Sequence, residues 1–246
     1  MSESKLSSTF FFVGKLSDHS AKYYVSNLEI NRDLVFEVML DNISIWGHSV
    51  KDFNDFFPEI REVLNILVSA FVFKNRKPLS YTIESWVESK NTISKSNMLG
   101  WVLNTHGEIK CFPRRSKSNT GWKKAVYFYK NIKKLNNNHI LALKDYRSSL
   151  TDSSEDALFF AYRAIEDICR ATTGVADIDE NAWQSMHSKL NTSKSLIDPL
   201  VSVVIKIRHG DKNDPLVIQS KSKRKELVAI AHQIIEKEYK RILPKF

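Results

Sequence analysis

Residues 153–174 have the sequence SSEDALFFAYRAIEDICRATTG, and their pattern is the strongest indication of how the second half of the chain folds. Residues 153–156 are typical of a helix start, and Gly174 is typical of a helix end. The apolar side chains between them recur at intervals of three and four, which predicts one buried face of a helix. That face comprises Leu158, Ala161, Ile165 and Ile168.

The sequence around this helix continues the same pattern. Helical spacing predicts three further helices, over residues 180–190, 195–208 and 220–243, after a lead-in segment at residues 140–150. Strand patterns stop at Asn136-Asn137-Asn138. We therefore predict an all-helical bundle over residues 136–246.

The first half has a different pattern. Aromatic and β-branched runs at residues 10–13, 23–25 and 34–40 predict strands, and residues 79–84 alternate as a strand does. A long helix is predicted between them, from Phe53 to Phe73. A hairpin is expected around residues 104–107, which separate residues 101–103 from 109–112. The predicted fold class is α+β, with an antiparallel sheet and one long helix in a domain of residues 1–135.

The composition indicates an ordinary globular protein with a basic first half. The chain has 246 residues and a formal net charge of +9. Residues 1–135 carry 20 Lys+Arg and 13 Asp+Glu, whereas residues 136–246 carry 17 and 15.

The cysteines, Cys111 and Cys169, are far apart, as expected in a reducing compartment. The longest apolar run, residues 66–73, is far shorter than the roughly 20 residues of a membrane span. We expect a cytoplasmic protein.

One stretch is both basic and aromatic. No Asp or Glu stands between Glu108 and Asp145, and aromatic residues are interleaved with the charges. Basic side chains neutralise phosphates and exposed aromatic rings stack on unpaired bases, so the pattern indicates contact with nucleic acid. The alternative is a solvated loop followed by a helix whose aromatic rings are buried. The candidate binding residues are Lys110, Arg114, Arg115, Lys117, Trp122, Lys123, Lys124 and Lys130.

Other catalytic patterns are missing from the sequence. Gly14-Lys15 does not complete a phosphate-binding loop, and no G-x-S-x-G elbow is present. The seven histidines form no H-x-x-x-H spacing, so we expect neither a metal site nor a cofactor.

The predicted helix 195–208 carries a second apolar stripe. Val201 and Ile205 point away from the main stripe, which indicates a partner surface on another segment or on a second subunit. His209 lies at the end of this helix, roughly opposite its core face, where the helix dipole favours an imidazolium. Alternatively, His209-Gly210 only ends the helix.

Residues 140–242 resemble the HEPN superfamily (higher eukaryotes and prokaryotes nucleotide-binding). Three elements carry the resemblance: the helix 157–166, the helix 183–190, and Arg208-His209-Gly210 before a long closing helix. Members are helical bundles that often dimerise, and many are ribonucleases in toxin or anti-phage systems. The resemblance implies a homodimer that engages RNA rather than DNA. If the protein is an enzyme, it is a metal-independent endoribonuclease with Arg208 and His209 as catalytic residues.

The sequence departs from the HEPN pattern at one position. In the family, an Arg precedes the His with four to six residues between them, but here Ser202, Val203 and Val204 occupy these places. Arg208 is instead adjacent to His209, and neighbouring residues on a helix point about 100° apart. The alternative is therefore a catalytically inactive dimerisation or adaptor module that acts through protein–protein contacts.

Overall fold

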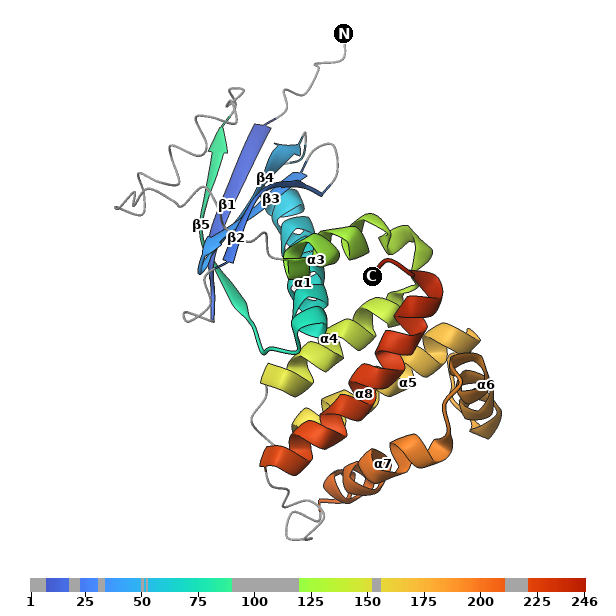
Figure 1. Ribbon diagram of the computed structural model, residues 1–246. Helices are drawn as coiled ribbons and strands as arrows, with labels where there is room; N and C mark the ends of the chain where they lie inside the picture. Colours follow the sequence, from blue (N-terminus) through green and yellow to red (C-terminus); the bar gives the residue numbers. More distant parts are fainter. Residues whose placement is uncertain are drawn as a thin grey trace. The chain divides into compact units, whose positions relative to one another are not determined.

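A computed structural model of the chain describes residues 8–17, 23–30, 34–49, 51, 53–89, 120–151, 156–210 and 221–246. The chain forms two compact units, one of residues 1–64 and 80–123 and the other of residues 65–79 and 124–246. The predicted fold class is confirmed, because the first unit contains an antiparallel sheet and the second is helical (Figure 1). The boundary predicted near residue 135 falls inside the second unit.

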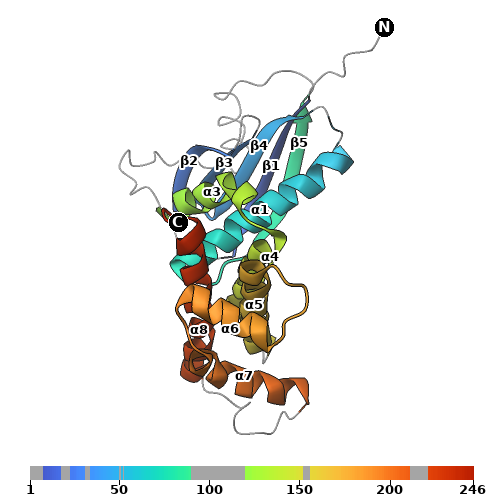
Figure 2. The ribbon, with the colours of Figure 1, turned by 90° about the vertical axis from the view of Figure 1, so that its right-hand side faces the viewer.

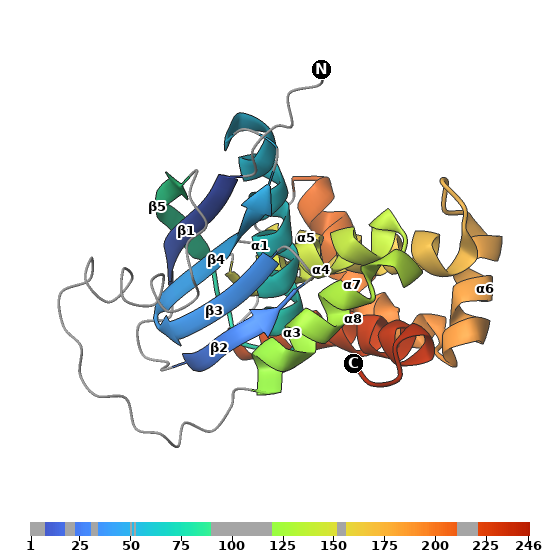
Figure 3. The same cartoon turned by 90° about the horizontal axis from the view of Figure 1, so that it is seen from above.

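The first unit is built on a five-stranded sheet. Its strands are β1 (Ser8–Leu16), β2 (Tyr23–Glu29), β3 (Leu34–Leu40), β4 (Asn42–Ser49) and β5 (Tyr81–Ser89). They lie in the order β2-β3-β4-β1-β5, and every neighbouring pair is antiparallel (Figure 3). The sequence did not predict β4 as a separate strand. The predicted hairpin at residues 101–112 lies outside the described residues.

The strand β1, which lies between β4 and β5, is buried on both faces. The Phe10 and Phe12 rings contact Phe56 of the helix α1 (Phe53–Asn75), with ring centres 5.1 and 6.2 Å apart. On the other face, Phe11 belongs to a buried cluster with Trp46. A strand covered on both faces has a continuous apolar run instead of an alternating one, which explains the sequence FFFV.

The described residues from 120 onward contain helices and no strand, and those from Lys124 onward belong to the second unit. After the end of α1 come α3 (Thr120–Lys130), η1 (Ile132–Lys134), α4 (Asn137–Thr151), α5 (Asp156–Thr173), α6 (Glu180–Leu190), α7 (Lys194–Arg208) and α8 (Lys221–Ile242). The helix α8 contacts α4, α5, α6 and α7, and it crosses in front of α5 in Figure 1. Figure 2 shows α6 and α7 from the side. The predicted helix 180–190 is confirmed.

Aromatic rings fill the centre of the helical unit. Tyr239 of α8 is almost fully buried, and its ring contacts Phe73 at 5.6 Å and Phe128 at 5.3 Å. Its hydroxyl donates a hydrogen bond to the carbonyl of His139. Since the phenol has a hydrogen-bond acceptor, it can be buried without leaving an unsatisfied polar group.

A buried histidine makes the stability of this unit depend on pH. His232 is 4% exposed and its ring stacks on Phe73 at 4.5 Å. Burial, and then the Arg76 guanidinium, lower the pKa of His232 from 6.5 to about 4. Between these two pH values the unfolded chain binds a proton that the folded chain does not. The contribution of His232 to stability is therefore complete above pH 6.5 and is lost as the pH falls through 4.

We expect the free energy of unfolding to fall by roughly 2 kcal/mol from this histidine between pH 7.5 and 4.5. Urea unfolding at both values should show a smaller loss in His232→Gln than in the wild type. The control His209→Gln changes an exposed histidine and should keep the wild-type loss. An unchanged loss in His232→Gln would assign the acid sensitivity to other groups.

Candidate functional site

The helix α7 presents two faces. Its buried face comprises Ile197, Leu200, Val203 and Val204. Its exposed face comprises Ser195, Asp198, Ser202, Ile205 and, at the helix end, His209. The backbone N–H of His209 donates to the carbonyl of Ile205, and Gly210 ends the helix with a positive φ of 74°. Apolar and histidine side chains thus lie one turn apart on the exposed face.

Arg208 turns from the end of α7 onto α5. Its guanidinium lies 5.2 Å from the ring centres of both Phe159 and Tyr162, and one of its nitrogens is 3.7 Å from the Glu166 carboxylate. Cation–π contacts and an ion pair together fix the guanidinium. Burial, and then the nearby Glu166 carboxylate, raise the pKa of Tyr162 to about 12. Tyr162 is therefore neutral at physiological pH.

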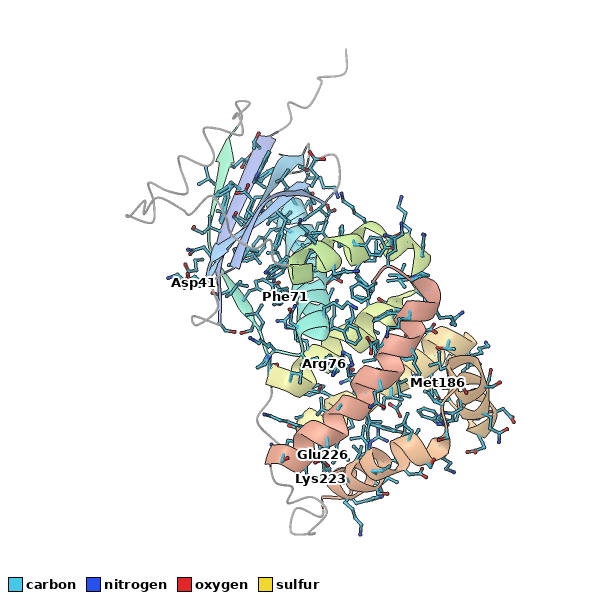
Figure 4. All side chains as sticks on the ribbon, in the orientation of Figure 1. Asp41, Phe71, Arg76, Met186, Lys223 and Glu226 are labelled. Atoms are coloured by element: carbon cyan, nitrogen blue, oxygen red, sulfur yellow. The ribbon has the colours of Figure 1, made fainter. Side chains whose placement is uncertain are left out.

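A row of rings continues from Tyr162 onto α6. The Trp183 ring is 6.4 Å from Tyr162 and 6.3 Å from His187. His187 Nδ1 lies 2.8 Å from the Thr192 hydroxyl oxygen, and burial lowers the pKa of His187. This row holds α5 and α6 together behind Arg208. Met186, labelled in Figure 4, is buried on the same helix.

The two predicted catalytic residues have different surroundings. Arg208 is 45% exposed at its side chain and is held by α5, whereas His209 is exposed at the helix end. Three α5 residues that hold Arg208 were not predicted as part of the site: Phe159, Tyr162 and Glu166. Their spacing of three and four on a predicted helix places them on one face, so the pattern was available in the sequence.

The predicted partner surface on α7 is partly exposed to solvent. Ile205 is 47% exposed and is one of the three large hydrophobic side chains that stand out among the described residues. Val201 is partly exposed. Single exposed apolar residues are common on soluble proteins, so the exposure of Ile205 is compatible with a partner surface and does not by itself require one.

The basic stretch is described only from residue 120 onward. Lys110, Arg114, Arg115 and Lys117 lie outside the described residues. On α3, Lys123 and Lys130 are exposed, and the partly exposed Tyr127 lies between them at helical spacing. These three residues form one outer face of α3. Lys124 is partly exposed, and its ammonium donates to the carbonyl of Lys245.

The assignment of Trp122 to nucleic-acid binding needs correction. Its side chain is fully buried, and its ring packs on Phe36 of the sheet at 5.1 Å. A buried ring has no free face for a base, so Trp122 belongs to the core of the first unit. For Trp122 the alternative to nucleic-acid contact is therefore correct, namely a helix whose aromatic rings are buried.

The described residues contain neither a metal-binding cluster nor a membrane-spanning helix. No group of three or more His, Cys, Asp or Glu side chains there is arranged to hold a metal ion. No helix in the described part of the chain is both long and apolar enough to cross a membrane.

The fold defines an α+β protein whose second half is a helical bundle, and a family model matches that half. Residues 127–242 are similar to the C-terminal domain of a family described as a domain of unknown function, DUF8168. The match extends from the middle of α3 to the end of α8 and so includes the site at the end of α7. No curated protein and no solved structure matches the chain.

Proposed function

We propose that the protein is a homodimeric, HEPN-type protein that engages RNA in a bacterial defence or toxin-like setting. The observation that carries the proposal is the exposed Ile205 one turn before Arg208 and His209 on α7. Pairing two copies of this face through Ile205 and Val201 would bring both His209 side chains into one cleft. The HEPN resemblance supports this pairing.

The proposed reaction is metal-independent cleavage of RNA. The 2′-hydroxyl oxygen attacks the adjacent phosphorus, and its proton passes to one neutral His209. The 5′-oxygen leaves with a proton from the second His209, which is protonated, so that the products are a cyclic phosphate and a 5′-hydroxyl. Arg208 stabilises the additional negative charge on the phosphoryl oxygens.

The second candidate function is a dimerisation or adaptor module without catalysis. Two observations favour it: the Arg208 guanidinium is already engaged by Glu166, and no Arg stands at residues 202–204. In this function the α7 face contributes only an interface, and the outer face of α3 still carries the basic charge.

Incubation with mixed RNAs in EDTA distinguishes the two functions. We expect cleavage by the wild type and a loss of about 10²- to 10⁴-fold in rate in His209→Ala, because a general acid–base group is removed. An all-2′-deoxy oligonucleotide should stay intact, since it lacks the attacking hydroxyl. Gln233→Ala, an exposed change on α8, serves as the control with wild-type cleavage. Intact RNA in the wild-type reaction would favour the adaptor.

A further inference from the structure

Four basic side chains from three helices converge in the helical unit. Lys74 lies in the last turn of α1, Arg76 directly follows that helix, Lys124 lies on α3 and Lys240 on α8. We call these four residues the convergent basic cluster. The Lys74 ammonium lies 4.6 Å from the centre of the Phe246 ring, and Lys124 donates to the carbonyl of the preceding residue, Lys245. Figure 4 labels Arg76 in this unit.

A single carboxylate is shared within the cluster. Glu236 lies 3.2 Å from the Lys240 ammonium and 4.0 Å from the Arg76 guanidinium. Within the described ranges of the chain, neither Lys74 nor Lys124 has an ion pair with a carboxylate. Lys74 rests on an aromatic ring, and Lys124 contacts a neutral carbonyl. The cluster therefore carries positive charge that the described carboxylates do not compensate.

The other three cations of the cluster act electrostatically on Lys74. Burial lowers the pKa of Lys74, and although Glu236 opposes this effect, Lys124, Lys240 and Arg76 lower the pKa further. Repulsion among like charges destabilises the protein unless an anion binds between them. A bound anion with several negative oxygens would relieve this repulsion at several cations at once.

Helix ends alone do not explain the arrangement. The dipole of a helix favours cations in its last turn, which accounts for Lys74 on α1 and Lys240 on α8. Lys124 stands near the start of α3, where the same dipole disfavours a cation. Lys124 also follows Lys123, which belongs to the outer face of α3. The cluster is thus continuous in sequence with a second row of basic side chains.

We propose that the convergent basic cluster binds the phosphate backbone of RNA and leads it onto the outer face of α3. This inference rests on the proposed function, because that function supplies RNA as the ligand. It adds Lys74, Arg76 and Lys240 to the predicted Lys124; no sequence pattern indicated them, since Lys74 and Lys240 stand more than 160 positions apart in the chain. The contact is to phosphates, so the cluster contributes affinity without choosing a base sequence.

The test measures RNA affinity as a function of salt. The probe is a short single-stranded 2′-O-methyl RNA with a fluorescein label, which cannot be cleaved through a 2′-hydroxyl. Each lost phosphate contact flattens the slope of log K against log salt by about 0.7. The variant Lys74→Gln/Lys124→Gln/Lys240→Gln should flatten the slope by about 2 and bind roughly 50-fold more weakly near 0.15 M salt.

The control removes the same number of lysines elsewhere in the unit. Lys189→Gln/Lys225→Gln/Lys237→Gln changes three exposed lysines and should keep the wild-type slope. If the cluster variant does not fold, the variant Lys124→Gln/Lys240→Gln, which leaves the half-buried Lys74 in place, should flatten the slope by about 1.4.

The outcomes separate the two proposals. Wild-type RNA binding with an unchanged slope in the cluster variant overturns the site at the cluster and leaves the proposed function standing. A wild-type protein that does not bind the RNA overturns both. Equal slope changes in the cluster variant and the control would show that net charge, and not this site, determines affinity.

Discussion

Ile205→Glu should convert a homodimer into a folded monomer. In the free chain Ile205 is 47% exposed, so a glutamate there is hydrated and changes the free energy of unfolding by only about 0.5 kcal/mol. In the proposed dimer the same carboxylate would be buried against its symmetry mate, which would bear an identical charge. An unpaired buried charge costs at least 3 kcal/mol, and the dissociation constant should rise by about 100-fold or more.

Light scattering and thermal unfolding together provide the measurement. The variant should show half the wild-type mass and a melting temperature close to that of a wild-type sample diluted to monomer. Val175→Glu is the matched control, because Val175 is also a large exposed apolar residue, at 38%, but lies between α5 and α6. It should leave the mass unchanged. A wild-type protein that is monomeric at high micromolar concentration would end the proposal of a dimer.

The elements were predictable because their patterns are local. Apolar spacing within α5, α6 and α7 depends only on neighbouring residues, so the sequence predicted these helices with bounds close to those observed. The strand β4 was not predicted, although Ile43, Ile45 and the intervening Ser44 alternate in type. Its residues follow β3 after a single turn residue, Asp41, so no Gly, Pro or Asn-rich turn separates the two strands in the sequence before Asn42.

Contacts between residues far apart in the sequence could not be predicted from local sequence patterns. Trp122 stands in a basic stretch, and only its contact with Phe36, 86 positions earlier, shows that it belongs to a core. The helix α1 is divided between the two units at residues 64 and 65. This division depends on which residues each turn of the helix contacts, and the apolar spacing of the helix does not show those contacts. A long amphipathic helix can contribute to two cores, so its sequence alone does not mark a domain boundary.

The candidate site was predictable only in part for the same reason. His209 is at a helix end and exposed, as its place after the apolar stripe indicated. The ion pair between Arg208 and Glu166 joins residues 42 positions apart, and no spacing rule relates them. The convergence of Lys74, Lys124 and Lys240 likewise arises from three helix directions, which only the fold determines.

Phe73→Ala should be among the most destabilising single changes in the helical unit. The Phe73 ring is 1% exposed and lies among four other rings, those of Tyr146, His232, Tyr239 and Phe246, at 4.5–6.0 Å. Truncation removes buried apolar surface and leaves a cavity that the helices α4 and α8 cannot fill. We expect a loss of about 3–5 kcal/mol in the free energy of unfolding.

Urea unfolding followed by circular dichroism measures this loss, and two further variants define its cause. Phe73→Leu keeps most of the volume and should cost less than about 1.5 kcal/mol. Phe160→Ala removes a ring of the same size from a partly exposed position on α5 and should cost about 1 kcal/mol, near the average for point mutants. If burial among the rings of α4 and α8 determines stability, the loss in the free energy of unfolding is largest for Phe73→Ala and smaller for both Phe73→Leu and Phe160→Ala. A loss below about 1 kcal/mol in Phe73→Ala would mean that the end of α1 contributes little to the helical core.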